Sequence, residues 1–402
     1  MLVSCFSDDS DPVRAGESVG RKLDGCEYSL VFVNHTYDAH KVVKAMRETC
    51  NTMVFGCSSS YGISDENLVE RGVCALGFSS RELVGGFAAE PMNGGYECGR
   101  SVAERAFSEL STERDRLTPI FARYNAIVSN MPEKIALSKP YFYMMDFINP
   151  MRFADEDFLH GVRDFINPTV PLVGAGSFTD VHTGRNYQIL NEAYSDSAVL
   201  GIFATNKSIG LSSEVAFVLR DPSPYIVTKA LNNRVYELNY RPALEVYSGI
   251  TGRSSAELRE ERTIAYSTGA EYPFVVFGPG DKVLMKYPAM VNDDDSITFG
   301  TKTADGSVLF SAKNDRKKMI ESATKAVKQA LKDVRVPQVL VIFDCWQRLA
   351  AMGEEYEKEA EAIINAAHGV NTIATYTMGE HFSMGTMRGH RNGSIVAVAM
   401  GD

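Results

Sequence analysis

The stretch from Thr52 to Phe78, TMVFGCSSSYGISDENLVERGVCALGF, decides how the chain is organised. Met53 to Gly56 is an apolar run typical of a buried strand, and Val73 to Phe78 has the composition of a second strand. Between them, Cys57 to Ile63 (CSSSYGI) contains the small polar residues and the glycine that favour a tight turn. The stretch therefore predicts a strand, a tight turn, a loop and a returning strand.

Two later stretches repeat this arrangement in weaker form. Residues 171–180 (PLVGAGSFTD) lead into the apolar run 197–203, and residues 372–380 (TIATYTMGE) lead into the run 394–400. Each of the three turns follows a helix-compatible segment and, before it, an apolar run of the kind expected for a strand covered on both faces. These runs end on Asn or Asp and span residues 28–34, 141–149 and 338–344. The sequence thus predicts three copies of a strand, helix, strand, turn, strand unit, and the long gap before the third copy leaves room for a degenerate fourth.

The length of the chain predicts two domains, because 402 residues exceed the size at which a single hydrophobic core stops growing. The pattern changes just after Ser223. Asn232-Asn233 predicts a hairpin turn, and Arg234 to Leu238 alternates as a strand does. We therefore predict an α/β fold with mixed sheets, divided into a domain of residues 1–223 and a domain of residues 224–402.

Composition excludes several classes of protein. A net charge of -10 argues against nucleic acid or an anionic membrane as the main partner. No apolar stretch reaches the ~18 residues of a membrane span, and the N-terminus lacks the basic and apolar regions of a signal peptide. The seven cysteines form no Cys-x-x-Cys pair, which is typical of reduced thiols in a cytosolic protein. We therefore expect a cytoplasmic protein.

Five motifs, taken in their order along the chain, resemble those of FIST-domain proteins. They are residues 56–63 (GCSSSYGI), 171–180, 235–247 (VYELNYRPALEVY), 345–348 (CWQR) and 376–380 (YTMGE). The similarity runs from about Tyr28 to Asn392 and includes both the N-terminal and the C-terminal FIST halves, so the two predicted domains resemble these two halves.

The resemblance implies an intracellular signal-input module of bacteria or archaea that binds small ligands. One branch of the family is similar to haem-binding nitric-oxide sensors that act on histidine kinases. This chain departs from the usual pattern in two places: serine replaces the common threonine in the first turn, and His381 follows Glu380 where an aliphatic residue is usual. No output domain is attached, so we expect signalling through a separate protein such as a histidine kinase.

Familiar catalytic and nucleotide-binding signatures are missing from the sequence. It has no G-x-x-x-x-G-K-[ST], and position 60 is Ser where the G-x-S-x-G elbow requires Gly. Cys57 lies at a strand exit and is a candidate nucleophile if a base such as His381 or His390 approaches it; a small buried thiol is the alternative. Arg348 is a candidate partner of Glu380, either in a structural ion pair or in a clamp for the carboxylate of an amino-acid-like ligand.

A haem would need an axial imidazole, and the chain has seven histidines. They are His35, His40, His160, His182, His368, His381 and His390. His390 lies near the C-terminal motif of the family and is the preferred candidate, although a surface or packing role is the alternative for each.

Three functions remain open from the sequence. The first is a non-catalytic sensor with a polar ligand pocket between repeated units. Its predicted lining residues are Cys57, Ser58, Ser59, Gly174, Gly176, Arg348 and Glu380. The second is a haem-based nitric-oxide sensor that uses His390. The third is an enzyme that works through Cys57 or through the pair of Arg348 and Glu380.

Overall fold

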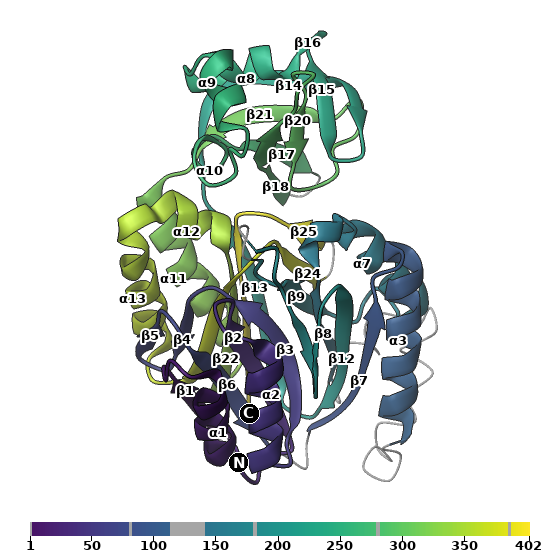
Figure 1. Cartoon of the computed structure of the whole chain (residues 1–402), viewed down its shortest axis with the longest axis vertical. Helices are drawn as coiled ribbons and strands as arrows, with labels where there is room; N and C mark the ends of the chain where they lie inside the picture. The colour runs from purple at the N-terminus through teal and green to yellow at the C-terminus, as the bar shows by residue number, and fades with distance from the viewer. Residues whose placement is uncertain (1, 80–82, 113–140, 180–182, 279–281, 385–386) are drawn as a thin grey trace.

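The structure is a computed structural model that describes residues 2–79, 83–112, 141–179, 183–278, 282–384 and 387–402. Its larger part, which we call the body, contains three six-stranded sheets (Figure 1). The first sheet has the order β1 (Leu2–Ser7), β6 (Val73–Phe78), β2 (Tyr28–Asn34), β3 (Met53–Ser59), β10 (Gln188–Leu190) and β11 (Ala193–Tyr194). The second has the order β7 (Leu83–Pro91), β12 (Ser197–Thr205), β8 (Tyr141–Ile148), β9 (Leu172–Gly176), β24 (Glu380–Met384) and β25 (Met387–Arg391). The third has the order β13 (Ser208–Val215), β26 (Ser394–Gly401), β22 (Pro337–Cys345), β23 (Asn371–Thr377), β4 (Gly62–Ser64) and β5 (Asn67–Val69).

The three sheets have the same strand directions when they are read in this order. The central pair is parallel in each of them, namely β2 with β3, β8 with β9 and β22 with β23. The flanking strands pair antiparallel on both sides. The mixed α/β class predicted from the sequence is therefore confirmed. That the three units descend from one repeated sequence stays a prediction.

Each sheet is completed by a hairpin from a different part of the chain. The pair β10–β11 joins the first sheet, although its chain neighbours β9 and β12 belong to the second. Likewise β24–β25 joins the second sheet through β9, and β4–β5 joins the third through β23. The exchanged hairpins link the three sheets in a closed cycle.

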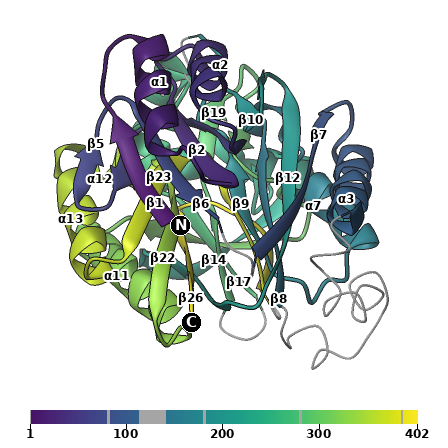
Figure 2. The ribbon, with the colours of Figure 1, turned by 90° about the horizontal axis from the view of Figure 1, so that it is seen from below.

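Pairs of helices cover the outer face of each sheet, as the view from below shows (Figure 2). The first sheet carries α1 (Pro12–Lys22) and α2 (Ala39–Thr49), the second carries α3 (Gly95–Thr112) and α7 (Asp155–Phe165), and the third carries α11 (Arg316–Lys332) and α13 (Tyr356–Ala367). Their apolar faces form three separate outer cores with the sheets. In α1, for example, the side chain of Asp11 caps the helix by accepting bonds from the amides of Val13 and Arg14, while Ala15 and Val19 face the core.

The inner faces of the three sheets share a fourth core. Phe32, Phe147 and Phe343, one from the parallel pair of each sheet, meet with ring centroids 5.7 to 6.0 Å apart. Edge-to-face contacts at this distance stabilise aromatic clusters beyond their burial. The body is therefore packed through its centre, and its polar groups collect where the parallel strands end.

A smaller part, which we call the cap, is formed by the described residues between 218 and 313. Its sheet contains β14 (Val218–Leu231), β15 (Arg234–Leu238), β16 (Arg241–Pro242), β17 (Phe274–Gly278), β18 (Lys282–Lys286), β19 (Pro288–Val291), β20 (Ile297–Phe299) and β21 (Val308–Lys313). The helices α8 (Ala243–Thr251), α9 (Ser255–Glu261) and α10 (Thr268–Glu271) pack beside it. It lies over the end of the body near α12 (Trp346–Met352) and β24–β25 (Figure 1).

The cap corrects the expectation of a fourth unit between Phe203 and Pro337. Every strand pair of the cap is antiparallel among the described residues, and β13 belongs to the third sheet of the body. A fourth strand, helix, strand unit would need a parallel pair. The predicted boundary near Ser223 falls within β14, and the division into residues 1–223 and 224–402 stays a prediction.

Candidate functional site

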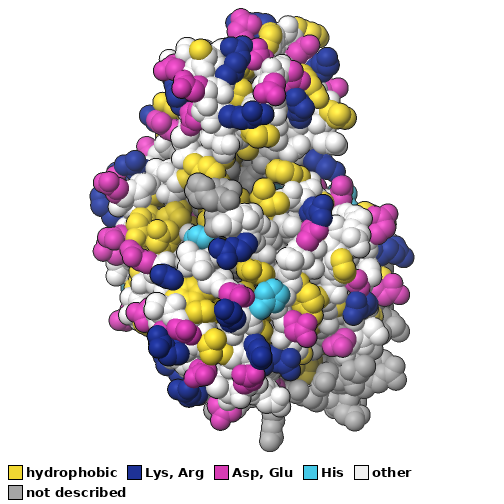
Figure 3. Space-filling view, in the orientation of Figure 1, with side chains coloured by type: hydrophobic (Ala, Val, Ile, Leu, Met, Phe, Trp, Pro, Cys, Tyr) yellow, Lys and Arg dark blue, Asp and Glu magenta, His cyan; other side chains and the backbone are white. Residues whose placement is uncertain are grey.

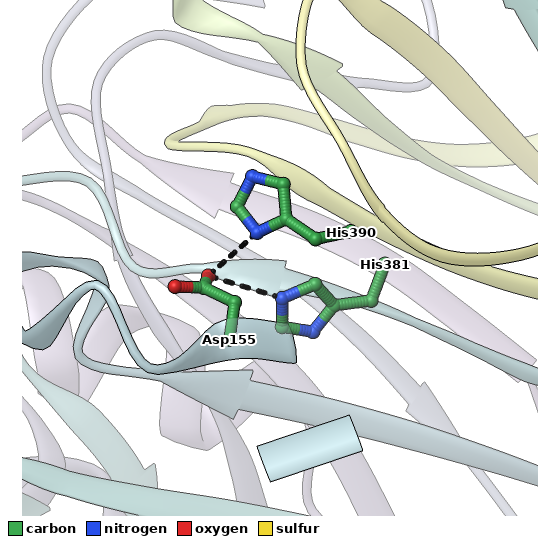
Figure 4. A group of neighbouring side chains, drawn as sticks. All are labelled: Asp155, His381 and His390. Atoms are coloured by element: carbon green, nitrogen blue, oxygen red, sulfur yellow. Dashed lines mark hydrogen bonds and ion pairs between the residues drawn. The ribbon is translucent and has the colours of Figure 1, made fainter. Parts of the chain in front are cut away.

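Three ionisable side chains meet near the junction of body and cap (Figure 4). His381 in β24 and His390 in β25 are directly opposite in the hairpin, so their rings lie on one face with centroids 5.5 Å apart. Asp155 is the first residue of α7. Its Oδ1 atom lies 3.2 Å from Nε2 of His381 and 2.9 Å from Nδ1 of His390. All three side chains are buried, so their charges interact at low dielectric.

In each imidazole one ring nitrogen, the inner one, faces Asp155, and the other, the outer one, faces a further acceptor. Nδ1 of His381 lies 2.5 Å from Oδ2 of Asp146, a fully buried carboxylate in the middle of β8. Nε2 of His390 lies 3.1 Å from Oδ1 of Asn392. These contacts fix the orientation of both rings.

The pKa values of the two carboxylates in this group are shifted in opposite directions, whereas those of both histidines are raised. Burial lowers the pKa of His381, but the carboxylates of Asp146 and Asp155 together outweigh burial and raise that pKa to about 10. The pKa of His390 is also raised, because the attraction of Asp155 exceeds the effect of burial. Burial raises the pKa of Asp155, but the two histidines more than compensate and hold it below its usual value. For Asp146 burial dominates, and its pKa is raised.

Arg348 belongs to a second buried group. Its Nε lies 2.9 Å from Oδ1 of Asp344, and its Nη2 pairs with Glu359. Nη1 donates to the hydroxyl of Ser322 at 3.1 Å, and Nη2 also donates to the carbonyl of Met319 at 2.9 Å. The suggested pairing of Arg348 with Glu380 is therefore wrong, because two closer carboxylates hold the guanidinium.

Glu380 lies between the two groups. Its oxygens accept bonds from Ser394 at 2.9 Å and from Thr377 at 3.3 Å. Burial raises its pKa to about 7, against the lowering effect of these hydroxyls and of His390. A carboxyl group with this pKa changes protonation near neutral pH.

The three turns singled out in the sequence converge at this end of the body. The amide of Phe178 donates to the carbonyl of Ser58 at 2.9 Å, and the amide of Gly176 donates to the carbonyl of Gly379 at 2.9 Å. The amide of Ser60 reaches the carbonyl of Tyr376 at 3.4 Å and closes the ring. The turns therefore bind one another through their main chains.

The glycines of the second turn are explained by these close approaches. A Cβ on Gly174 would lie 2.2 Å from the carbonyl oxygen of Asp146, and one on Gly176 would lie 2.3 Å from that of Met378. Both contacts are with protein, so packing suffices to require glycine at these positions.

The structure brings only some of the predicted site residues together. Five of them lie at the ends of the strands that lead into the converging turns, namely Cys57, Ser58, Ser59, Gly174 and Gly176. Glu380 follows the third turn, and Arg348 lies in its own ion-pair group. All seven are buried. Their role in holding a ligand stays a prediction.

Cys57 is fully buried, and neither His381 nor His390 pairs with it. Burial raises the pKa of its thiol, which disfavours the thiolate that a nucleophile needs. All seven cysteines lie in described residues, and each is buried and outside any disulfide.

Sequence reasoning missed Asp146 and Asp155. Asp146 had a visible signal, because it interrupts the otherwise apolar strand YFYMMDFI at a position expected to be buried. Asp155 had none beyond its place at a helix start. His381 was considered as a base for Cys57 and as one of seven possible haem ligands, and its pairing with His390 depends on a hairpin register that composition does not reveal.

His390 does not fit haem in this structure. Its Nδ1 faces Asp155 at 2.9 Å and its Nε2 faces Asn392 at 3.1 Å. A Cβ on Gly379 would lie only 2.5 Å from Nε2, so the backbone packs tightly there. Axial ligation needs one free ring nitrogen facing the porphyrin, and neither nitrogen has that space. Of the other candidates, His182 lies outside the described residues.

A narrow apolar cavity of about 30 Å³ lies inside the body, at the opposite end from the ionisable groups. Tyr28, Phe55, Tyr143 and Phe203 are among its lining residues, which come from all three sheets and include no histidine. Ligand pockets for drug-sized molecules occupy about 300–1,000 Å³. This cavity therefore has no room for such a ligand unless side chains move.

The sequence was compared with known families and proteins. The profile of the FIST N domain matches residues 28–241, and that of the FIST C domain matches residues 243–383. The chain belongs to the FIST family. FIST domains are generally sensory domains that bind small ligands in signal transduction. No curated protein matches the chain.

Solved structures add little to the FIST assignment. A cyanuric acid hydrolase from A. caulinodans is 7% identical, with 100% of this chain and 99% of that chain covered and a TM-score of 0.38. PurLQS from Thermotoga maritima is 10% identical, with 100% and 72% covered and a TM-score of 0.19. At these scores neither likeness carries an argument about the FIST chain.

Two surface properties are relevant to partners of this FIST protein. On the face in Figure 3, basic and acidic side chains are intermingled over both the body and the cap. No helix in the described part of the chain is long and apolar enough to cross a bilayer.

Proposed function

We propose that this FIST protein is a cytoplasmic sensor that binds a small ligand without transforming it and passes the signal to a separate protein, such as a histidine kinase. The proposed lining of the site is the set of residues named from the sequence: Cys57, Ser58, Ser59, Gly174, Gly176, Arg348 and Glu380. An amino-acid-like molecule is the first class of ligand to test. Seven cysteines outside any disulfide support a reducing compartment, and the net charge of -10 disfavours nucleic acid as a partner.

One observation carries the proposal: the cap contacts three elements that bear buried ionisable groups, namely α12, the β24–β25 hairpin and α7. Tyr266 of the cap packs on Trp346 of α12, with ring centroids 4.4 Å apart, and α12 also carries Arg348. Arg391 of the β24–β25 hairpin donates to the carbonyl of Val283 at 3.2 Å.

The third contact involves the helix that begins at Asp155. Nζ of Lys302 in the cap lies 2.7 Å from both carboxylate oxygens of Asp157, which is in the first turn of α7. A ligand that changes the packing of α12, α7 or the hairpin thus alters a surface on which the cap rests. Such differential contacts are what a ligand needs to shift a conformational equilibrium.

Trp346 provides the test, because it is the only tryptophan of the chain and lies at the junction. Amino acids and related carboxylates would be screened for thermal stabilisation, and each hit titrated while the emission of Trp346 is recorded. We expect a hit to change this emission. The matched variant Tyr266→Leu should bind the same ligand by calorimetry with a smaller change. A ligand that binds without altering Trp346 emission or hydrogen exchange in the cap would refute the coupling.

A visible absorption spectrum tests the haem alternative. Protein from cells supplied with haem precursor should be colourless and should take up no added haem, because His390 does not fit that role. A Soret band that shifts with nitric oxide and is lost in His390→Ala would replace our proposal with a haem sensor.

Thiol titration tests the alternative of an enzyme with a Cys57 nucleophile. We expect no fast-reacting thiol in the native protein and seven after unfolding, because every thiol is buried. A single fast thiol that disappears in Cys57→Ala, together with turnover of a bound ligand, would favour the enzyme.

A further inference from the structure

We propose that Asp155, His381 and His390 form a binding site for one divalent first-row transition-metal ion, with Zn²⁺ as the first ion to test. The three donor atoms all lie within 4.8 Å of one another. Two imidazoles and one carboxylate are a common three-residue set for such ions, and they leave coordination positions for water or a small ligand. This inference does not depend on the identity of the sensed ligand.

The positions of protons favour this assignment. His381 faces the Asp146 carboxylate through Nδ1, and His390 faces the Asn392 carbonyl oxygen through Nε2. When a metal ion binds, the oxygen acceptors on these outer nitrogens can hold the protons of the neutral tautomers. In those tautomers the lone pairs of the two inner nitrogens point toward the same oxygen of Asp155 (Figure 4). Without a metal ion, protons on the inner nitrogens bridge the two rings to Asp155, and a metal ion would displace these protons.

The outer contacts also match the surroundings of known metal sites. In a ligating histidine, the N–H of the ring nitrogen that does not bind the metal almost always donates a hydrogen bond to a carboxylate or carbonyl. This bond orients the ring and raises its basicity. Asp146 and Asn392 are placed to do this for the two rings, and both are buried. They are positioning residues in our proposal.

Charge balance gives the third argument. Asp146 and Asp155 bring two negative charges into a buried site. A divalent ion with two neutral imidazoles balances these charges, as two imidazolium ions do in its absence, so no buried charge is left unpaired when the ion replaces the protons. In addition, the ion would tie the start of α7 to the β24–β25 hairpin, two segments that are far apart in the chain.

The test is the metal content of the full-length protein after removal of any affinity tag. We expect plasma mass spectrometry to find about one metal ion per chain. A chelator should remove this ion, and calorimetry should then show that the protein binds one equivalent of added Zn²⁺. Co²⁺ should give visible bands typical of nitrogen and oxygen ligation. Asp155→Asn and His390→Gln should each weaken binding by more than about 100-fold, and Asp146→Asn by about 10- to 100-fold.

His160→Gln is the matched control, because His160 is an exposed histidine of the same helix, α7. It should bind like the parent protein. Circular dichroism and thermal unfolding in chelator establish that each variant is folded, and Asp155→Asn keeps the shape of the side chain. The proposal is overturned if the folded parent protein takes up no Zn²⁺, Co²⁺ or anaerobic Fe²⁺, or if Asp155→Asn and His390→Gln bind these ions as well as His160→Gln does. Because ligand binding is read from Trp346, failure of the metal site and failure of the sensor proposal are distinguishable.

Discussion

Arg348 is the largest fully buried side chain among the described residues, and it carries a charge. Its neighbours Asp344 and Glu359 are also buried, and burial raises the pKa of Asp344, so the group is balanced as an ion pair of Arg348 and Glu359 beside a protonated Asp344. Removing one member of a buried ion pair usually costs more than the pair contributes, because an unpaired charge stays behind. The stability of the third sheet and its helices therefore depends on this group being complete.

We predict that Arg348→Met lowers the free energy of unfolding by about 3–5 kcal/mol, measured by urea denaturation. Arg316→Met is the matched control, because Arg316 pairs with Glu355 at the surface, where the side chains are 53% and 36% exposed. That change should cost less than about 1 kcal/mol. Equal losses in the two variants would show that Arg348 is not held as described.

The ionisable site shows where prediction from sequence stops at the scale of residues. Glu380, His381 and His390 were recognised as polar residues near a motif, but the carboxylates that the two histidines meet lie more than two hundred residues away in the chain. Asp146 lies 235 residues from His381 in the chain. Local patterns identify which side chains are unusual, whereas register and packing between sheets decide which of them meet.

At the scale of elements, the strands and crossover helices of the body follow from sequence periodicity. Strands β2, β8 and β22 coincide with the three apolar runs, and the hairpin turn at Asn232-Asn233 joins β14 to β15 as predicted. The exchanged hairpins could not be predicted in this way. Strands such as β4 (Gly62–Ser64) are only three residues long. Their pairing depends on the position of the neighbouring strand in the other sheet, and local propensity does not predict it.

Glycines test this packing at the level of a single element. A Cβ on Gly56 in β3 would lie 1.8 Å from the carbonyl oxygen of Val31 in the adjacent strand, so Gly56→Ala must displace backbone. We expect this substitution to lower the free energy of unfolding by about 3 kcal/mol or more. Gly249→Ala is the opposite case, because Gly249 lies within α8 and its Cβ would meet nothing within 4 Å. The Gly249→Ala substitution should raise the free energy of unfolding by about 0.5–1 kcal/mol.

Chemical denaturation of the two glycine variants measures whether Gly56→Ala lowers the free energy of unfolding and whether Gly249→Ala raises it. A neutral Gly56→Ala would mean that β2 and β3 separate easily, which contradicts a tightly packed parallel pair. A destabilising Gly249→Ala would mean that α8 is not helical at that position.

At the scale of the whole molecule, the cap is an insertion between β13 and α11. In the other two units the corresponding strand and helix are almost adjacent: β1 ends at Ser7 before α1 starts at Pro12, and β7 ends at Pro91 before α3 starts at Gly95. The ends of the insertion are also neighbours, because Val218 pairs with Lys313. The body can therefore be closed without the cap.

We predict that replacing residues 218–313 with a short Gly-Ser linker leaves a folded body that unfolds cooperatively. The deletion removes 96 residues (313 − 218 + 1) of 402, and the denaturant slope m scales with the surface exposed on unfolding, so m should fall by about a quarter. Trp346 would lose its contact with Tyr266, so its emission should shift to the red and become accessible to acrylamide. A deletion variant that is unfolded by circular dichroism would show that the cap is part of the folding unit. A folded variant with unchanged Trp346 emission would instead show that the cap does not cover α12, and would remove the basis for coupling a ligand to the cap.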